Sequence, residues 1–248
     1  MYHIKFFAAV LLSLTLFLAC NEEQIVNNSP EAVETASSQD YSEQLAKRNR
    51  TAEFEITLEN LSPATGPGAS QPFSPPVIVT HTPRYHVFKL HKYASDELRQ
   101  IAEDAVNGPM IDKLNNDLFA YDVVQGGNGP IFPGSMQKFM IKTKLPFVRI
   151  SLVAMLVNTN DAFTGIDAAK LPLWGSKTYY LKTYDAGTEE NTELKANIPG
   201  PCCGSPHVRV PTSEKIKYHN GILGIGDLDP AIFDWNNPVA KLTITRIK

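Results

Sequence analysis

The strongest constraint on the fold is a period-two alternation of apolar and polar residues near both ends of the region 51–248. In residues 54–59 the apolar side chains Phe54, Ile56 and Leu58 alternate with polar ones, and Leu242 and Ile244 alternate in the same way within residues 240–245. Successive side chains of a strand point to opposite faces. Both segments are therefore predicted to be half-buried strands of a common sandwich.

Between these two segments the pattern predicts further strands and one clear helix. The strand candidates are residues 76–80, 85–90, 118–124, 136–143, 148–157 and 177–184. Residues 150–157 are almost entirely apolar apart from Ser151, which is typical of a central strand covered on both faces. Ser95 can cap a helix whose apolar positions recur at helical spacing until Gly108 and Pro109 end it, and residues 111–114 can form a second short helix. The fold class predicted is all-β: one antiparallel β-sandwich domain at residues 51–248 with one or two short inserted helices.

The N-terminus has the pattern of a lipoprotein signal peptide. Lys5 precedes an apolar run at residues 6–18, and Ala19 stands directly before Cys20. The apolar run is shorter than the ~20 residues that span a bilayer. We expect residues 1–19 to be removed and Cys20 to carry the lipid. Residues 20–50 are then a polar tether, because their composition offers little apolar surface to bury.

Charge and cysteine content narrow the function further. The formal net charge is −3, without the basic footprint that a nucleic-acid partner requires, so we expect none. Only Cys202 and Cys203 remain after Cys20, and neighbouring cysteines cannot join distant segments. They can form a vicinal disulfide or remain two thiols, and a zinc site is disfavoured because no second cysteine pair exists.

Two oxygen-rich segments, residues 158–165 and 184–191, each follow a strand-like run. They contain Asp161 and Asp185 as the main candidate metal ligands, with Glu189, Asn160 and Glu190 as further oxygen donors. A hard cation such as calcium takes 6–8 oxygen ligands, and loops at the end of a sandwich can converge to supply them. The alternative is that these residues only cap turns, since Asn and Asp bond to their own backbone.

Other candidates are weaker. His81, His86 and His91 are spaced by five, which places alternate members on opposite sides of a strand and disfavours a zinc cluster. Trp174 and Trp235 are interpreted as packed aromatic anchors, although Trp174 follows a proline-containing loop and can be exposed. The sequence contains no Gly-x-Ser-x-Gly nucleophile motif.

The order of the segments resembles the spondin N-terminal domain family. The resemblance lies in Gln-Pro-Phe-Ser-Pro-Pro at residues 71–76, Thr-His at 80–81, the helical segment 94–104, Asn-Asp-Ala-Phe-Thr-Gly at 160–165, Tyr-Asp-Ala-Gly-Thr-Glu at 184–189 and the last strand at 239–246. Residues 219–222 and 226–229 look like the bacterial lipoprotein branch of the family.

The resemblance implies a sandwich similar to a C2 domain, used for adhesion and recognition outside the cell, with a calcium-like ion near one end. It implies Asp161 and Asp185 as ligands and adds the backbone carbonyl of Glu189. At the position of a further family glutamate an ungapped count reaches Arg149, which cannot ligate a cation. If Arg149 lies beside the two aspartates, it can neutralise them without a metal.

The sequence thus predicts a non-enzymatic binding or adhesion module of the bacterial cell envelope. We expect it to be attached through Cys20, on the outer membrane, and to recognise an extracellular protein or glycan with the help of a divalent cation, calcium in the first place. Two alternatives remain open: a metal-dependent hydrolase acting on an envelope or extracellular polymer, and a structural envelope protein that needs no metal.

Overall fold

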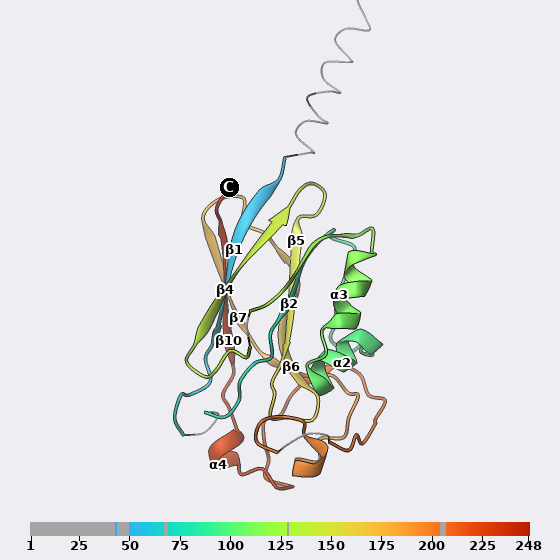
Figure 1. The fold of residues 1–248 in the computed structure, drawn as a ribbon, viewed down its shortest axis with the longest axis vertical. Coiled ribbons are helices and arrows are strands. Elements are labelled where there is room, and N and C mark those ends of the chain that lie inside the picture. Colours follow the sequence, from blue (N-terminus) through green and yellow to red (C-terminus); the bar gives the residue numbers. More distant parts are fainter. Residues whose placement is uncertain (1–42, 44–49, 67–68, 128, 204–206) are drawn as a thin grey trace, which may run out of the picture. The chain divides into compact units, whose positions relative to one another are not determined.

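A computed structural model describes Glu43 and residues 50–66, 69–127, 129–203 and 207–248. The predicted signal peptide, Cys20 and nearly all of the predicted tether lie outside the described residues. The remainder forms two antiparallel sheets that face each other, with two helices on the outer side of one sheet (Figure 1). The all-β sandwich predicted from the sequence is confirmed.

The first sheet joins the two ends of the region. Its strands run in the order β4 (Met136–Thr143), β1 (Ala52–Asn60), β10 (Ala240–Arg246) and β7 (Ser176–Leu181). Strands β1 and β10 pair directly, with Ile56 opposite Ile244 and Leu58 opposite Leu242. The alternation read from the sequence therefore gives the correct inward face for both strands.

The second sheet carries the candidate site. Its order is β3 (Ala120–Gln125), β2 (Val77–His81), β5 (Arg149–Met155), β6 (Ala162–Lys170), β8 (Thr183–Asp185) and β9 (Lys217–Tyr218). Strand β5 is central and buried on both faces, as predicted. Ile150, Leu152 and Ala154 face the first sheet, whereas Val153 belongs to a second core beneath the helices.

Helix α2 (Asp96–Asp104) and helix α3 (Gly108–Asn115) cover the outer face of the second sheet. Ser95 caps α2, its side chain accepting a hydrogen bond from the N–H of Leu98 at 3.3 Å. The predicted stop at Gly108 and Pro109 is also the start of α3, because proline suits the first turn of a helix. A single turn, α4 (Pro230–Phe233), and a short 3-10 helix, η2 (Lys195–Asn197), lie in the C-terminal third of the chain.

Three sequence predictions about strands were wrong in detail. Residues 85–90 form no strand, since Asp167 holds the N–H groups of Val87 and Phe88 in place of a ladder. Strand β6 was not predicted, because its first four residues belong to the oxygen-rich segment 158–165. The predicted strand 177–184 is divided at Lys182 between β7 and β8, which belong to different sheets.

Candidate cation site and neighbouring pocket

One end of the sandwich is rich in carboxylates. We call residues 156–161, 185–200 and 219–239 the acidic end; this end contains α4 and lies at the bottom of Figure 1. Within these segments one residue, Lys195, is basic, against eight acidic residues: Asp161, Asp185, Glu189, Glu190, Glu193, Asp227, Asp229 and Asp234. Strands β5, β6 and β8 bring the first three of them to this end.

Asp161 is the most buried of these carboxylates. It lies directly before β6 with no exposed surface. Its Oδ2 accepts hydrogen bonds from the backbone N–H of Thr188 at 2.7 Å and of Glu189 at 3.1 Å, and from the Thr188 hydroxyl at 3.2 Å. Its Oδ1 is buried without any hydrogen-bond partner. A buried acceptor without a partner is costly, which marks Oδ1 as a position for a ligand.

Asp185 lies beside Asp161 because β8 pairs with β6. Asp185 is opposite Ala162 in the register, and the N–H of Ala186 donates to the Asp161 carbonyl at 3.2 Å. The Asp185 carboxylate accepts from the Gly187 N–H at 2.7 Å through Oδ1 and from the Asn191 amide at 2.7 Å through Oδ2. The structure therefore brings together the two aspartates that the sequence singled out.

Burial, followed by the negative charge of Asp185, raises the pKa of Asp161 to about 7, although hydrogen bonds from Thr188 and Glu189 oppose the rise. Two carboxylates at close quarters resist ionising together. A cation between them would remove this repulsion. The donor set, two aspartates with one free buried oxygen, fits a hard cation that prefers oxygen ligands.

Glu189 meets this pair through its backbone. Its N–H bonds Asp161, but its buried side chain accepts from the Val210 N–H at 3.1 Å, and His207 Nε2 lies 3.9 Å from the same Oε1 atom. Burial, followed by the charge of Glu103, raises the pKa of Glu189 to about 8. The prediction that Glu189 contributes a backbone carbonyl is therefore compatible with the direction of its side chain.

Asn160 and Glu190, the two additional candidates, differ from each other. The Asn160 amide nitrogen donates to the Asn197 carbonyl at 3.2 Å and its oxygen accepts from the Glu193 N–H at 3.3 Å. Asn160 thus fastens the neighbouring loop. Glu190 is exposed. Among the described residues no group of three or more His, Cys, Asp or Glu side chains is arranged to hold a metal ion, so a cation here would need backbone and water oxygens beside the two aspartates.

The possibility that Arg149 neutralises the aspartates is wrong. Arg149 begins β5 and is paired with His81 and Lys170, whereas Asp161 lies beyond the other end of that strand. The basic group near the site is Lys217 on β9, which is opposite Asp185 in the register with Nζ 3.6 Å from Oδ2. The same ammonium contacts Glu214. Lys217 lies 32 positions after Asp185, and no local pattern in the sequence indicates this pairing.

A second layer of polar contacts holds the site. His219 is buried, and burial lowers its pKa. Its Nδ1 accepts from the Gly221 N–H at 3.0 Å, so the proton lies on Nε2, which donates to Asn191 Oδ1 at 3.2 Å. Asn191 in turn bonds Asp185. Asp227 and Asp229 hold other parts of the same end, where they accept hydrogen bonds from the backbone N–H groups of Lys195 and Ala231.

The site is also tied to helix α2 by an ion pair between the buried Glu103 and the partly exposed Arg209. Both oxygens of Glu103 accept from Arg209, at 2.6 and 2.7 Å, and the Arg209 guanidinium also donates to the Thr188 carbonyl at 3.0 Å. The Glu103 side chain is fully buried. The loop that bonds Asp161 is therefore held from both sides.

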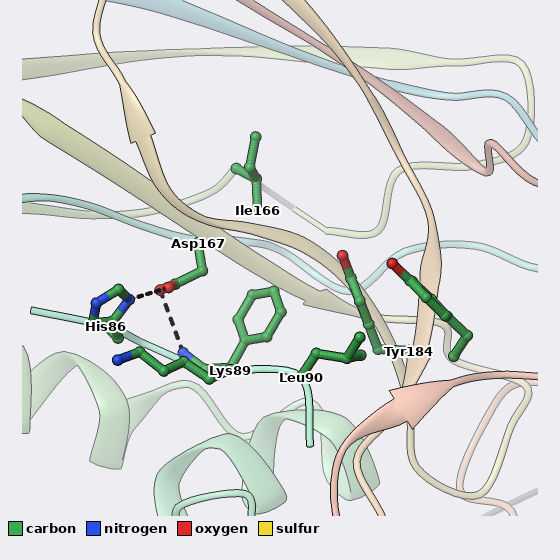
Figure 2. Close-up of a pocket in the computed structure, with 8 residues that line it drawn as sticks. His86, Lys89, Leu90, Ile166, Asp167 and Tyr184 are labelled. Atoms are coloured by element: carbon green, nitrogen blue, oxygen red, sulfur yellow. Dashed lines mark hydrogen bonds and ion pairs between the residues drawn. The ribbon is translucent and has the colours of Figure 1, made fainter. Parts of the chain in front are cut away.

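A pocket of about 340 Å³ is lined by residues of the segment 86–90 and of strands β6, β8 and β9 (Figure 2). Its lining residues are His86, Phe88, Lys89, Leu90, Ile166, Asp167, Tyr184 and Tyr218. Asp167 bonds His86 Nδ1 at 2.5 Å, and Tyr184 stacks on Tyr218 with ring centres 5.4 Å apart. Because Tyr184 and Asp185 are consecutive in β8, the cation site and this pocket share one strand.

The remaining sequence candidates can now be placed. His81 bonds Ser151 Oγ at 2.8 Å inside the sheet, and His86 bonds Asp167. Cys202 and Cys203 form a vicinal disulfide, one of the two alternatives left open. Trp235 is packed as predicted, whereas Trp174 is 79% exposed.

The fold and the site define a two-sheet β-sandwich domain with a pair of buried aspartates at one end. The family model of Spondin_N matches residues 52–203. Because this match covers more than half of the chain, the chain belongs to the Spondin_N family. The matched residues include both aspartates and Glu189, whereas Lys217 and His219 lie beyond them. No curated protein matches the chain, and none of the described helices is long and apolar enough to cross a bilayer.

Proposed function

We propose that this protein is a recognition module of the cell envelope, anchored through a lipid on Cys20, whose binding loops are fixed by a divalent cation at Asp161 and Asp185. The observation that supports the cation site is the buried Asp161 Oδ1, which has no hydrogen-bond partner. A second carboxylate, that of Asp185, lies near enough for its charge to raise the pKa of Asp161. Calcium is the cation favoured by the chemistry of the donors, since carboxylates, carbonyls and water are its usual ligands.

The cation would be held by Asp161, Asp185 and the Glu189 carbonyl, and water would supply the remaining oxygens. When bound, it supplies positive charge to loops that otherwise carry uncompensated carboxylates. Thr188, Asn191 and Arg209 keep these loops in position through the hydrogen bonds given above. The role of the ion in this proposal is structural.

The pocket between His86, Asp167 and Tyr184 is the place where we expect an extracellular ligand to bind. Small-ligand sites are concave and mostly apolar, with a few polar groups that fix orientation, and His86 and Lys89 stand here beside aromatic rings. A glycan offers the hydroxyl groups for such contacts. A glycan array probed with the unlipidated chain and with His86→Ala/Lys89→Ala tests this role. A glycan bound equally by both proteins would place recognition elsewhere.

The metal-dependent hydrolase is the rival function. It requires a cation that activates water and therefore an activity that Asp161→Asn abolishes. In the module that we propose, Asp161→Asn alters stability and ligand affinity, and neither the native protein nor this variant hydrolyses the polymer. Incubation with envelope polysaccharides and analysis of the products by mass spectrometry separates the two functions.

The cation is tested by thermal unfolding of the chain from Asn21 to Lys248, first treated with a chelator and then titrated with calcium, magnesium or zinc. Binding to the native state stabilises it by about 2.7 kcal/mol when the free ion exceeds Kd a hundredfold. We expect calcium to raise the Tm of the native sequence and of Glu190→Gln, in which an exposed neighbouring carboxylate is removed. Asp161→Asn should not respond, and an equal response in this variant would refute the site.

Anchoring is tested independently of the cation. We expect the mature protein isolated from cell membranes to begin at Cys20 with acyl groups, as measured by mass spectrometry of its N-terminal peptide, and Cys20→Ser to prevent this processing. A mature chain that begins elsewhere would refute the anchor.

A further inference from the structure

The end of the sandwich opposite the acidic end has a distinct surface. Strand β1 begins there and β10 ends there, at the top of Figure 1. We call residues 50–51, 82–84, 117–119, 144–149, 170–175 and 246–248 the basic end. Backbone hydrogen bonds join these segments: the N–H of Thr82 donates to Phe119, that of Leu171 to Val148 and that of Arg246 to Gly175.

The charges of this end are almost all positive although the whole chain is acidic. One residue of these segments, Asp117, is acidic, against seven basic ones: Arg50, Arg84, Lys144, Arg149, Lys170, Arg246 and Lys248. The next carboxylate along β1, Glu53, is matched by Lys142 at 3.9 Å. A surface of this kind complements anionic groups over its whole extent.

Large apolar side chains stand among these charges and point into solvent. Leu118 is 91% exposed and Trp174 is 79% exposed, and the same end exposes Phe119, Leu145, Val148, Leu173 and Ile247. Exposed apolar side chains gathered in one place mark an interaction surface, whereas single ones need no explanation. Basic and apolar side chains together are the combination that binds the interface of an anionic bilayer.

The chain itself enters the fold at this end. Arg50, the first residue of the continuous described range, lines a groove of about 260 Å³ together with Leu145, Leu173 and Arg246. Any attachment of the chain N-terminal to Arg50 therefore acts on the basic end. The 29 residues between Cys20 and Arg50 separate the proposed lipid from this surface.

We propose that the basic end docks on an anionic lipid bilayer, with Trp174, Leu173 and Leu118 at the headgroup boundary and the basic side chains on the lipid phosphates. This inference depends on the proposed function in one respect only: the envelope location supplies the membrane. Docking in this orientation turns the acidic end and its cation site away from the lipid. It also keeps the carboxylates of the acidic end apart from a surface that would repel them.

Tryptophan fluorescence provides a direct readout because the chain has two tryptophans, of which Trp235 is buried and Trp174 is exposed. The chain from Asn21 to Lys248 retains both sheets and both cores, and it lacks the lipid. Mixed with vesicles of phosphatidylglycerol and phosphatidylcholine at low salt, it should sediment with them and its emission should shift to the blue. Phosphatidylcholine vesicles alone should give neither change, and Trp174→Phe should remove the shift but keep sedimentation.

Charge variants locate the contact. Each basic residue near an anionic surface contributes about fivefold to binding, so Lys170→Glu/Lys248→Glu should weaken vesicle binding by more than about tenfold. Both side chains are exposed, and unchanged thermal unfolding will show that the variant is folded. Lys195→Glu at the acidic end is the matched control for the charge variant. Trp174→Ala removes an exposed apolar side chain of the basic end, and Ile225→Ala, which removes one at the acidic end, is its control. Both controls should bind as the native sequence does.

Several results would overturn the inference. These are no sedimentation with phosphatidylglycerol vesicles, equal losses in the variants and their controls, and sedimentation without any change in Trp174 emission. Self-association that Trp174→Ala abolishes, without vesicle binding, would make a second copy of the chain the occupant of this surface. Because the test uses unlipidated protein, its failure is separate from a failure of the lipid anchor, which is read from the N-terminal peptide.

Discussion

At the acidic end the decisive charged side chains are buried and bonded to backbone N–H groups, whereas at the basic end most of them are exposed beside exposed apolar residues. Asp161 accepts three hydrogen bonds on one oxygen, and Glu193 accepts the N–H groups of Leu223 at 2.6 Å and Ile225 at 2.9 Å. Lys170 and Lys248 are exposed. The carboxylates therefore shape the loops that carry them, while exposed ammonium groups such as those of Lys170 and Lys248 can contact a partner.

Because the two ends differ in this way, substitutions at the acidic end should change the free energy of unfolding, and substitutions at the basic end should change binding to a partner. Substitutions among buried carboxylates leave backbone donors without acceptors, which costs free energy of unfolding. Substitutions of exposed lysines away from such contacts change stability by less than about 0.5 kcal/mol. Four experiments, taken from the largest expected effect to the smallest, can show whether the two ends differ in this way.

The largest effect is expected for Glu193→Ala at the acidic end. The substitution leaves the N–H groups of Leu223 and Ile225 without their acceptor, at about 1–3 kcal/mol for each buried group. Urea unfolding should show a loss of roughly 3 kcal/mol. Glu190→Ala, which removes an exposed carboxylate three positions away, is the control and should be nearly neutral. Equal losses would show that burial does not distinguish these carboxylates.

The second effect is a dependence of stability on pH that calcium removes. The pKa of Asp161 rises to about 7 on folding and that of Glu189 to about 8, so the folded state holds protons that the unfolded state has released. Their stabilisation is complete below about pH 4, decreases progressively as pH rises above that value, and is lost once pH exceeds about 7 for Asp161 and about 8 for Glu189. In chelator, stability should fall over this window, and saturating calcium should flatten the curve. A chelated protein whose stability is constant from pH 5 to pH 8 would contradict this prediction.

The sequence predicted the fold better than it predicted the neighbours of the site. Alternation in β1 and β10 and the apolar run of β5 identify strands because their burial follows a period of two or is complete. Asp161 and Asp185 were found because each lies where a strand meets a loop. Their surroundings depend on pairings between distant segments. The pairing of β8 with β9 places Lys217 beside Asp185, and it also positions the next residue but one, His219, which bonds Asn191. No local pattern encodes these contacts.

The basic end was not predicted for the same reason. Its charges come from six separate segments, and of its basic residues only Arg50 belongs to a basic run in the sequence, at residues 47–50. Only the antiparallel order of the strands places residues 82–84, 144–149 and 170–175 at one end. Trp174 could be exposed according to its proline-containing loop, but its neighbours could not be known.

A third, smaller effect concerns Lys217, whose ammonium already lies 3.6 Å from Asp185. A cation at the aspartates competes with this charge, because like charges repel at short range. Lys217→Met should strengthen calcium binding severalfold, an increase on the order of 1 kcal/mol, as measured by calorimetric titration. Lys215→Met, a neighbouring exposed lysine, is the control. A weaker affinity in Lys217→Met would mean that the lysine supports the site rather than competing for it.

The smallest effect on stability is expected at the basic end. A small effect there would show that its charged side chains do not hold the fold. Lys170→Ala and Lys248→Ala remove exposed ammonium groups, so each should change the free energy of unfolding by less than about 0.5 kcal/mol. Vesicle binding should nevertheless fall about fivefold for each, because the lost interaction is with lipid phosphates and not with the protein. Parallel urea unfolding and vesicle sedimentation measure both quantities on the same samples. A loss of stability as large as that of Glu193→Ala would show that the basic end, like the acidic end, uses its charges to hold its own loops, and would remove the reason for expecting them to meet a membrane.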